Sequence, residues 1–167
     1  NKLFGIHAGE RDADDITPAF DLDPDFLVHM VYPETDHLTR LATEQIPTVV
    51  CPRSNLVTGV GVPPMSDLAE RTTLALGTDN AMLNAPSMFR EMAYTAKLTD
   101  ISARRILEMA TINGAEIANL DYGVIEPGRK AKLLVLDGAS DNLAGAQDIV
   151  RAVVRRADRA DISDVIL

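Results

Sequence analysis

The sequence is poor in cysteine, in lysine and in long apolar runs, and the shortages of cysteine and of long apolar runs each exclude a class of protein. Its single cysteine, Cys51, excludes an internal disulfide and any zinc site built from a cysteine cluster. No apolar run approaches the roughly 18 residues that a membrane-spanning helix needs. A hydrophobic content of 46% over 167 residues is nevertheless enough for one sizeable core, or for a core with an appendage.

The shortage of lysine is part of an unusual charge balance. The chain has 4 lysines and 12 arginines against 17 aspartates and 8 glutamates, and its net charge is -9 at pH 7. An acidic chain repels phosphates, so this composition argues against nucleic acid as a partner. A surface rich in aspartate and poor in lysine suggests a salt-rich cytoplasm, and we expect a cytoplasmic protein that does not bind membranes.

An initial methionine is also missing, and an apolar strand is predicted almost immediately after Asn1 and Lys2. We expect no signal peptide before that strand. We therefore expect the chain to be part of a longer protein.

Three short apolar runs each end in a side chain that can bind a metal or transfer a proton. They are residues 3–6 before His7, residues 26–28 before His29, and residues 74–76 before Asp79. Catalytic groups collect at the carboxyl ends of the strands in a barrel of alternating strands and helices. Asp79 alone is better explained as a turn cap, and His7 alone as a structural histidine. The occurrence of all three together favours a site.

The segments around these runs predict a parallel sheet with helices outside it, because strands alternate with crossovers. We expect strands at residues 3–7, 25–30, 47–51 and 73–76, and helices near Pro18 and at residues 34–44 and 65–71. Residues 51–55 are predicted to turn into a loop that reaches Pro64. Three further helices are expected at residues 87–98, 101–109 and 113–120.

The pattern changes after Asp121. Residues 122–128 are rich in turn formers and predict a hairpin, and strands are expected at residues 132–137, 149–156 and 162–167. The sequence therefore predicts an α/β fold with half of a barrel in residues 1–120 and part of a separate β-unit in residues 121–167.

Several motifs along the chain resemble those of the amidohydrolase superfamily, in its cytosine/adenosine-type deaminase and chlorohydrolase branch. They follow the order of the second half of such an enzyme: His7-Ala8-Gly9-Glu10, Leu27-Val28-His29-Met30, Cys51-Pro52-Arg53-Ser54-Asn55, Leu76-Gly77-Thr78-Asp79, residues 109–115 (Met-Ala-Thr-Ile-Asn-Gly-Ala) and residues 123–137. The resemblance implies the C-terminal half of a TIM-type (β/α)8 barrel, strands 5–8 with their helices, followed by part of a small β-sandwich domain.

The resemblance also implies a role for each matching residue. His7 would be a metal ligand, and Asp79 a second ligand that also accepts a proton from the metal-bound water. Glu10 would protonate a ring nitrogen of the substrate, and His29 would orient the hydroxide or stabilise the oxygen of the tetrahedral intermediate. Ser54 and Asn55 would shape the substrate pocket. The implied cofactor is one divalent metal, with zinc expected and iron as the alternative.

One departure from the family pattern bears on activity, because the His-x-His pair of the first barrel strand is absent. Two protein ligands do not complete the four-coordinate geometry expected of zinc. The first hypothesis is therefore that the parent protein is a metal-dependent aminohydrolase of a heterocycle, such as a guanine, cytosine, adenosine-like or triazine compound. The second is that this chain is a non-catalytic half that needs a partner segment carrying the His-x-His ligands. Amide hydrolysis in place of deamination is a third reading, which the Glu10 position disfavours.

Two further expectations concern parts outside this site. His37 has no counterpart in the family and is expected to be an ordinary surface histidine. Half of a barrel leaves unpaired strand edges and an apolar inner face, so we expect the isolated chain to associate with the missing half or with itself.

Overall fold

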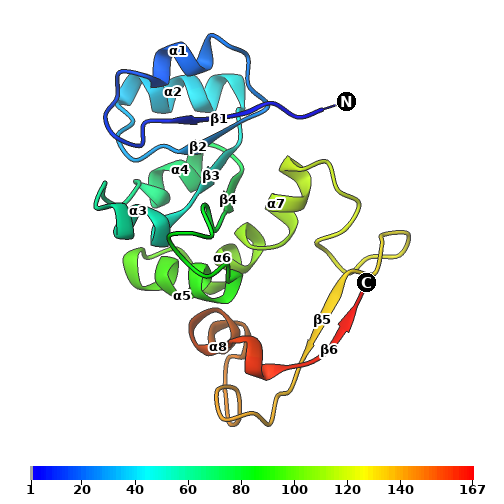
Figure 1. The fold of residues 1–167 in the computed structure, drawn as a ribbon. Coiled ribbons are helices and arrows are strands. Elements are labelled where there is room, and N and C mark those ends of the chain that lie inside the picture. The colour runs from blue at the N-terminus through cyan, green and yellow to red at the C-terminus, as the bar shows by residue number, and fades with distance from the viewer. Residues whose placement is uncertain (1) are drawn as a thin grey trace.

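The fold combines a parallel sheet with a separate antiparallel strand pair, and a computed structural model describes it for residues 2–167 (Figure 1). The first sheet contains β1 (Gly5–Ala8), β2 (Phe26–His29), β3 (Thr48–Val50) and β4 (Leu74–Leu76), hydrogen-bonded in chain order. All three of its pairings are parallel, for example His7 with Val28 and Val50 with Leu76. The predicted parallel sheet is confirmed, and its strands end side by side.

Helices connect these strands and bury the apolar face of the sheet. They are α1 (Ile16–Phe20), α2 (Thr35–Glu44), α3 (Pro52–Thr58) and α4 (Met65–Arg71). Apolar side chains between the sheet and its helices form the main core, which includes Phe20, Leu27, Leu41, Leu68, Leu74 and Ile106. Their removal from water is the main force that holds strands and helices together.

The expectation of a loop directly after β3 is wrong, because residues 52–58 form α3. Pro52 occupies the first turn, where a missing N–H has no consequence. Gly59 ends the helix in the left-handed conformation at φ 76°, which glycine adopts without strain. Both signals are in the sequence, and α3 turns the side chains of Ser54 and Asn55 inward, where they are buried.

Three helices follow β4 as predicted: α5 (Met88–Leu98), α6 (Ala103–Met109) and α7 (Ile112–Ile117). Ser87 and Ser102 cap α5 and α6 by accepting hydrogen bonds from backbone N–H groups three residues on, each at 3.4 Å. Asn113 at the start of α7 donates from Nδ2 to the carbonyl of Leu74 at 2.8 Å. This bond fixes α7 against β4, the strand that leads to Asp79.

The strand expected at residues 149–156 is wrong, because these residues form α8 (Ile149–Arg156). The carboxylate of Asp148 caps the helix by accepting from the N–H of Arg151 at 2.9 Å. Ala152 and Val154 are both buried, which imitates the alternation of a strand. They face different cores, however: Ala152 packs with Leu143, whereas Val154 belongs to the main core.

The second sheet pairs β5 (Leu133–Leu136) with β6 (Ile162–Ile166) in antiparallel fashion, and both strands were predicted. A 3-10 turn, η1 (Arg159–Asp161), leads into β6. The hairpin expected at residues 122–128 is absent from the described residues, which form only turns there. The division of the chain at residue 120 stays a prediction.

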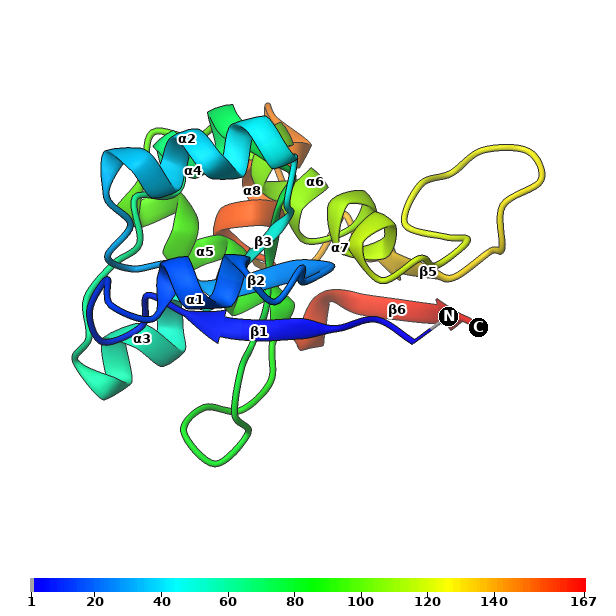
Figure 2. The same ribbon diagram turned by 90° about the horizontal axis from the view of Figure 1, so that it is seen from above.

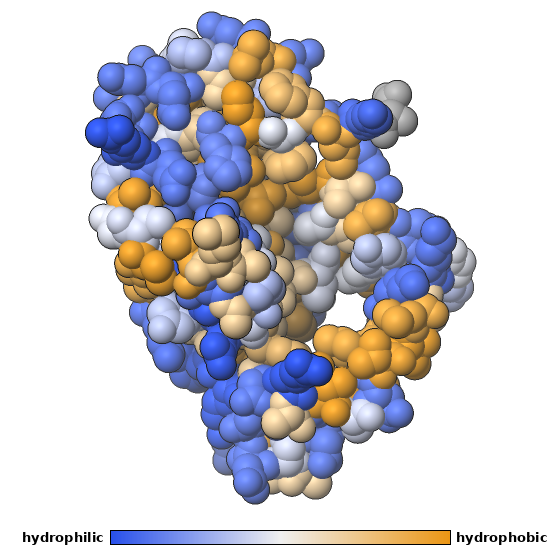
Figure 3. Space-filling model, in the orientation of Figure 1, coloured by the Kyte–Doolittle hydropathy of each residue, from blue (hydrophilic) through white to orange (hydrophobic). Residues whose placement is uncertain are grey.

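The β5–β6 pair carries an exposed apolar surface. It projects to one side of the helical layer (Figure 2), and its side chains form an apolar band in the space-filling view (Figure 3). Leu134 and Val165 are more than half exposed, at 54% and 55%. Among residues 2–167, no helix is long and apolar enough to cross a membrane.

Candidate metal and active site

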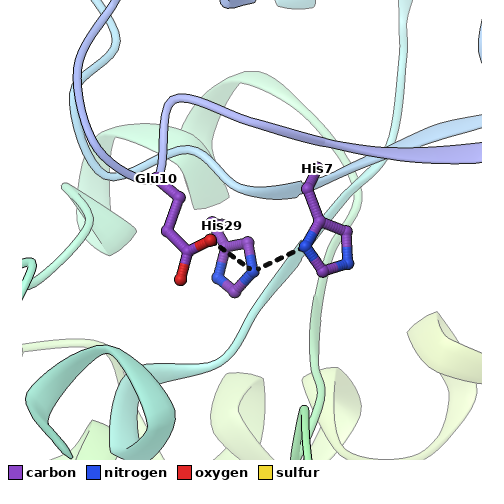
Figure 4. A group of neighbouring side chains, drawn as sticks. All are labelled: His7, Glu10 and His29. Carbon is purple, nitrogen blue, oxygen red and sulfur yellow. Dashed lines mark hydrogen bonds and ion pairs between the residues drawn. The ribbon is translucent and has the colours of Figure 1, made fainter. Parts of the chain in front are cut away.

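The ends of β1 and β2 bring His7, Glu10 and His29 together (Figure 4). His7 lies in β1, His29 is the last residue of β2, and Glu10 follows β1 after a tight turn. Gly9 makes the turn possible: it has φ 63°, and a Cβ there would lie 2.7 Å from Cδ1 of Ile16. The parallel pairing of β1 with β2 therefore places all three side chains at the carboxyl-terminal end of the sheet.

The three side chains are close enough to contact one common metal ion. Nε2 of His29 lies 3.1 Å from Nδ1 of His7 and 3.6 Å from Oε2 of Glu10. One ligand atom from each residue lies within 4.8 Å of the other two. His29 is fully buried, whereas His7 is exposed and the Glu10 side chain is one-third exposed. An imidazole pair beside a carboxylate is a donor set that suits a divalent metal.

Asn55 fixes the orientation of His29. Its Oδ1 lies 2.9 Å from Nδ1 of His29, and both side chains are fully buried. An amide oxygen can only accept, so Nδ1 of His29 donates to it and Nε2 is directed at His7 and Glu10. Nε2 then accepts from Nδ1–H of His7 when His29 is neutral, which leaves the Nε2 lone pair of His7 free. The amide nitrogen of Asn55 is buried and has no hydrogen-bond partner among residues 2–167.

Asp79 lies outside this group of three and is held by a neighbour of Asn55. The hydroxyl of Ser54 donates to Oδ2 of Asp79. Asp79 is three residues beyond the end of β4, after Gly77, where a Cβ would lie 2.9 Å from Cγ1 of Val49. Helix α3 thus connects the two parts of the predicted site, because Ser54 binds Asp79 and Asn55 binds His29.

Two of these residues have strained backbones. His29 has φ 77° and Asp79 has φ 53°, in the left-handed region that non-glycine residues rarely adopt. Such strain costs on the order of 1–3 kcal/mol per residue and is concentrated at functional sites. It therefore supports a functional reading of both strand ends.

The structure adds a buried ion pair that the sequence reasoning missed. Nη1 of Arg53 donates to Oε1 of Glu91 at 3.1 Å, and the backbone N–H of Arg53 donates to Oε2 at 3.3 Å. Nη2 donates to Oδ1 of Asn84 in the loop after β4 at 3.1 Å. Glu91 is fully buried, and burial raises the pKa of its carboxyl while the bonds from Arg53 oppose that rise. The pair ties α3 to α5 and to the loop that follows Asp79.

A signal for this pair is present in the sequence. Glu91 is three residues after Met88 and four before Thr95, so it lies on the inward face of a predicted helix. A carboxylate on such a face requires a buried partner. Arg53, inside the Cys-Pro-Arg-Ser-Asn motif, supplies it.

The thiol of Cys51 is unsuited to act as a nucleophile. Burial, followed by the nearby charges of Asp79 and Glu91, raises the pKa of Cys51 to about 12. We expect iodoacetamide at pH 8 to leave Cys51 unmodified in the folded protein and to label it fully in urea, as mass spectrometry would show. Rapid labelling of the folded protein would contradict this assignment.

His37 lies in α2, away from the site. Its Nδ1 accepts from the N–H of Glu34 at 3.1 Å, and its Nε2 lies 3.1 Å from the hydroxyl of Thr17. The ring also stacks on Phe20, with centroids 6.5 Å apart. These contacts are those of a helix-capping histidine.

Known proteins resemble this chain in both sequence and structure. The amidohydrolase family model matches residues 6–167. An uncharacterised protein from Methanocaldococcus jannaschii is 34% identical over an alignment of 180 positions, which covers 99% of this chain and 47% of that protein. The 5-methylthioadenosine/S-adenosylhomocysteine deaminase of Haloarcula marismortui is 29% identical over an alignment of 187 positions, which covers 96% of this chain and 43% of that enzyme.

Among solved structures, an adenosine deaminase from Xanthomonas campestris with bound zinc superposes with a TM-score of 0.86 at 23% identity. The match covers 98% of this chain and 43% of that structure, so the α/β fold resembles part of that larger enzyme. The chain spans less than half the length of each of these relatives. By its sequence match over residues 6–167, the chain belongs to the amidohydrolase family.

Proposed function

We propose that the complete protein is a metal-dependent aminohydrolase that hydrolyses a C–N bond of a heterocyclic substrate, and that this chain supplies part of its site. The observation that carries the proposal is the convergence of His7, Glu10 and His29 at the ends of two adjacent parallel strands. The names of the relatives, which include deaminases, support the same reaction class.

The proposal includes an arrangement of the complete enzyme. Strands β1–β4 would be strands 5–8 of a (β/α)8 barrel in residues 1–120, and residues 121–167 would complete a small β-sandwich domain. Parallel pairing of β1–β4 in chain order and the partial coverage of longer relatives support this arrangement. The exposed apolar side chains of β5 and β6 would pack against the rest of that domain.

The residues present fit a divalent metal. His7 has a free imidazole lone pair, and in the described part of the chain only the Ser54 hydroxyl bonds the Asp79 carboxylate. We assign His7 and Asp79 as its ligands, with zinc expected and iron as the alternative, and the missing segment would supply further imidazoles. When bound, the metal would lower the pKa of water and make it nucleophilic near neutral pH.

The protein groups around the substrate would handle the protons. Protonated Glu10 would donate to a ring nitrogen, which makes the adjacent carbon more electrophilic. Asp79, held by Ser54, would accept a proton from the attacking water. His29, oriented by Asn55, would donate from Nε2 to the developing oxyanion when that nitrogen is protonated. The unpartnered amide nitrogen of Asn55 would hydrogen-bond the substrate. The amino group would leave as ammonia after it receives the proton that Asp79 took from water, and the hydroxyl of the tetrahedral intermediate would return a proton to Glu10 as the carbonyl forms.

The first test of this function is ammonia release by the complete protein. 5-Methylthioadenosine is the first substrate to try because of the named relatives, followed by adenosine, guanine and cytosine. We expect release with at least one heterocyclic amine, loss of activity on treatment with a chelator, and recovery with zinc. Turnover that survives complete removal of metal would refute the metal-dependent assignment.

The 167-residue chain alone is expected to bind metal weakly and to have no deaminase activity. Two protein ligands leave a tetrahedral site incomplete, and half of a barrel leaves the substrate cavity open. The measurement is metal analysis after desalting, with an ammonia assay on the same sample. One tightly bound zinc with measurable turnover would show that the chain is catalytically complete.

A further inference from the structure

A groove lies between α3, α5 and α8, outside the group formed by His7, Glu10 and His29. Figure 1 shows α5 between the other two helices. The groove has a volume of about 470 Å³, within the usual range for a small-molecule site. Its walls carry cationic and apolar side chains, including Val57, Phe89, Arg90, Tyr94, Lys97 and Arg156.

The groove is basic although the chain as a whole is acidic. Five cationic side chains line it, and Arg53 is the member already paired with Glu91. Within residues 2–167, the other four, Arg90, Lys97, Arg155 and Arg156, form no ion pair with a carboxylate. Asp158 is the one acidic lining residue, and its Oδ1 caps η1 by accepting from the N–H of Ala160 at 2.7 Å. Four unneutralised cations at one groove of a chain with net charge -9 indicate an anionic ligand.

The spacing of the cations indicates an elongated ligand. Arg90 and Lys97 are seven residues apart on one face of α5, which separates them by roughly 10 Å along the groove. Arg155 reaches the same groove from α8, where Nη2 donates to the carbonyl of Ala96 at 3.1 Å. Cations spread over this length of helix suit a chain of phosphates with an organic group better than a single phosphate.

Exposed apolar side chains in the groove indicate that the organic part of the ligand is a planar aromatic group. Tyr94 is 41% exposed between the two cations of α5, and Nζ of Lys97 lies 5.5 Å from its ring centroid. Leu56 and Val57 of α3 form the facing wall and are 41% and 55% exposed. A planar aromatic group between these side chains would remove apolar surface from water and would stack on an aromatic ring.

We propose that this groove binds a nucleoside di- or triphosphate, with its phosphates on Arg90, Lys97 and Arg156 and its base against Tyr94. The net charge of the chain would repel an extended nucleic acid, which favours a small nucleotide. The site is separate from the proposed active site and does not depend on the proposed reaction.

The test is calorimetric titration of the complete protein with ADP at low ionic strength. The double variant Arg90→Gln/Lys97→Met should bind ADP at least about tenfold more weakly, because each charged hydrogen bond contributes more than a factor of ten. The control is Arg104→Gln/Lys130→Met, which removes the same charge from exposed positions outside the groove and should bind ADP like the wild type.

A third variant and a second probe test the base contact. Tyr94→Ala should weaken ADP binding and leave pyrophosphate binding unchanged, and pyrophosphate should bind the wild type more weakly than ADP. Equal losses in the groove and control variants would show non-specific attraction and would overturn the proposal. No binding by the wild type, or binding that the groove variant does not affect, would do the same. Equal affinity for pyrophosphate and ADP would overturn the nucleotide assignment.

Discussion

Glu10→Gln in the complete enzyme is expected to lower kcat by about 10²–10⁴-fold while metal content stays near that of the wild type. Glutamine keeps the size and hydrogen-bonding reach of Glu10 but cannot deliver a proton to a ring nitrogen. Glu10 is one-third exposed and 3.6 Å from His29, so the substitution leaves the buried core intact. The measurement is kcat together with metal stoichiometry on the same preparation.

Asp79→Asn serves as the matched comparison, because it is also an isosteric change of a carboxylate at a strand end. It removes a proposed metal ligand, so we expect a loss of both metal and kcat. Loss of metal from Glu10→Gln would make Glu10 a ligand, and the assignment would be wrong. If that variant loses neither metal nor rate, the His-x-x-Glu match is accidental.

Glu91→Ala is expected to lower the free energy of unfolding by about 3–5 kcal/mol, because it leaves the guanidinium of Arg53 buried without a counter-charge. Arg53 is 7% exposed and Glu91 is fully buried, so the pair is shielded from solvent. Equilibrium urea unfolding measures the change. The loss should be accompanied by a lower kcat, since the pair holds α3, which carries Ser54 and Asn55.

Glu108→Ala provides the control for that prediction. Glu108 pairs with Arg104 at 3.1 Å on the surface of α6, where such pairs are worth about 0.3–0.5 kcal/mol. Replacing both members of the buried pair, as in Arg53→Met/Glu91→Leu, should recover most of the stability. A loss below about 1 kcal/mol for Glu91→Ala would mean that the pair contributes little to the fold.

The parallel sheet could be predicted because its signals are local. Each of its strands is a short apolar run between turn formers, and each connection is long enough for a parallel crossover. The mistaken strand at residues 149–156 shows where such reasoning fails. Buried residues at alternate positions usually indicate a strand, but Ala152 and Val154 are buried in two different cores on two sides of one helix. Tertiary packing of that kind has no local signature.

The residue types of the candidate site could be predicted from the sequence, but the hydrogen bonds and ion pair that link those residues could not. His7, Glu10 and His29 converge, whereas Asp79, the third side chain of the strand-end pattern, lies outside this group. Asp79 is joined to them indirectly, through the adjacent Ser54 and Asn55 of a helix that was expected to be a loop. The pair between Arg53 and Glu91 links residues 38 positions apart, so neither residue alone identifies its partner.

The most direct test of the account is the metal content of the complete protein after desalting, for the wild type, His7→Ala and His37→Ala. The account predicts one metal ion per chain in the wild type and in His37→Ala, whose histidine caps α2, and a clear loss in His7→Ala. Full metal content in His7→Ala would contradict the assignment of the end of β1 as part of the metal site.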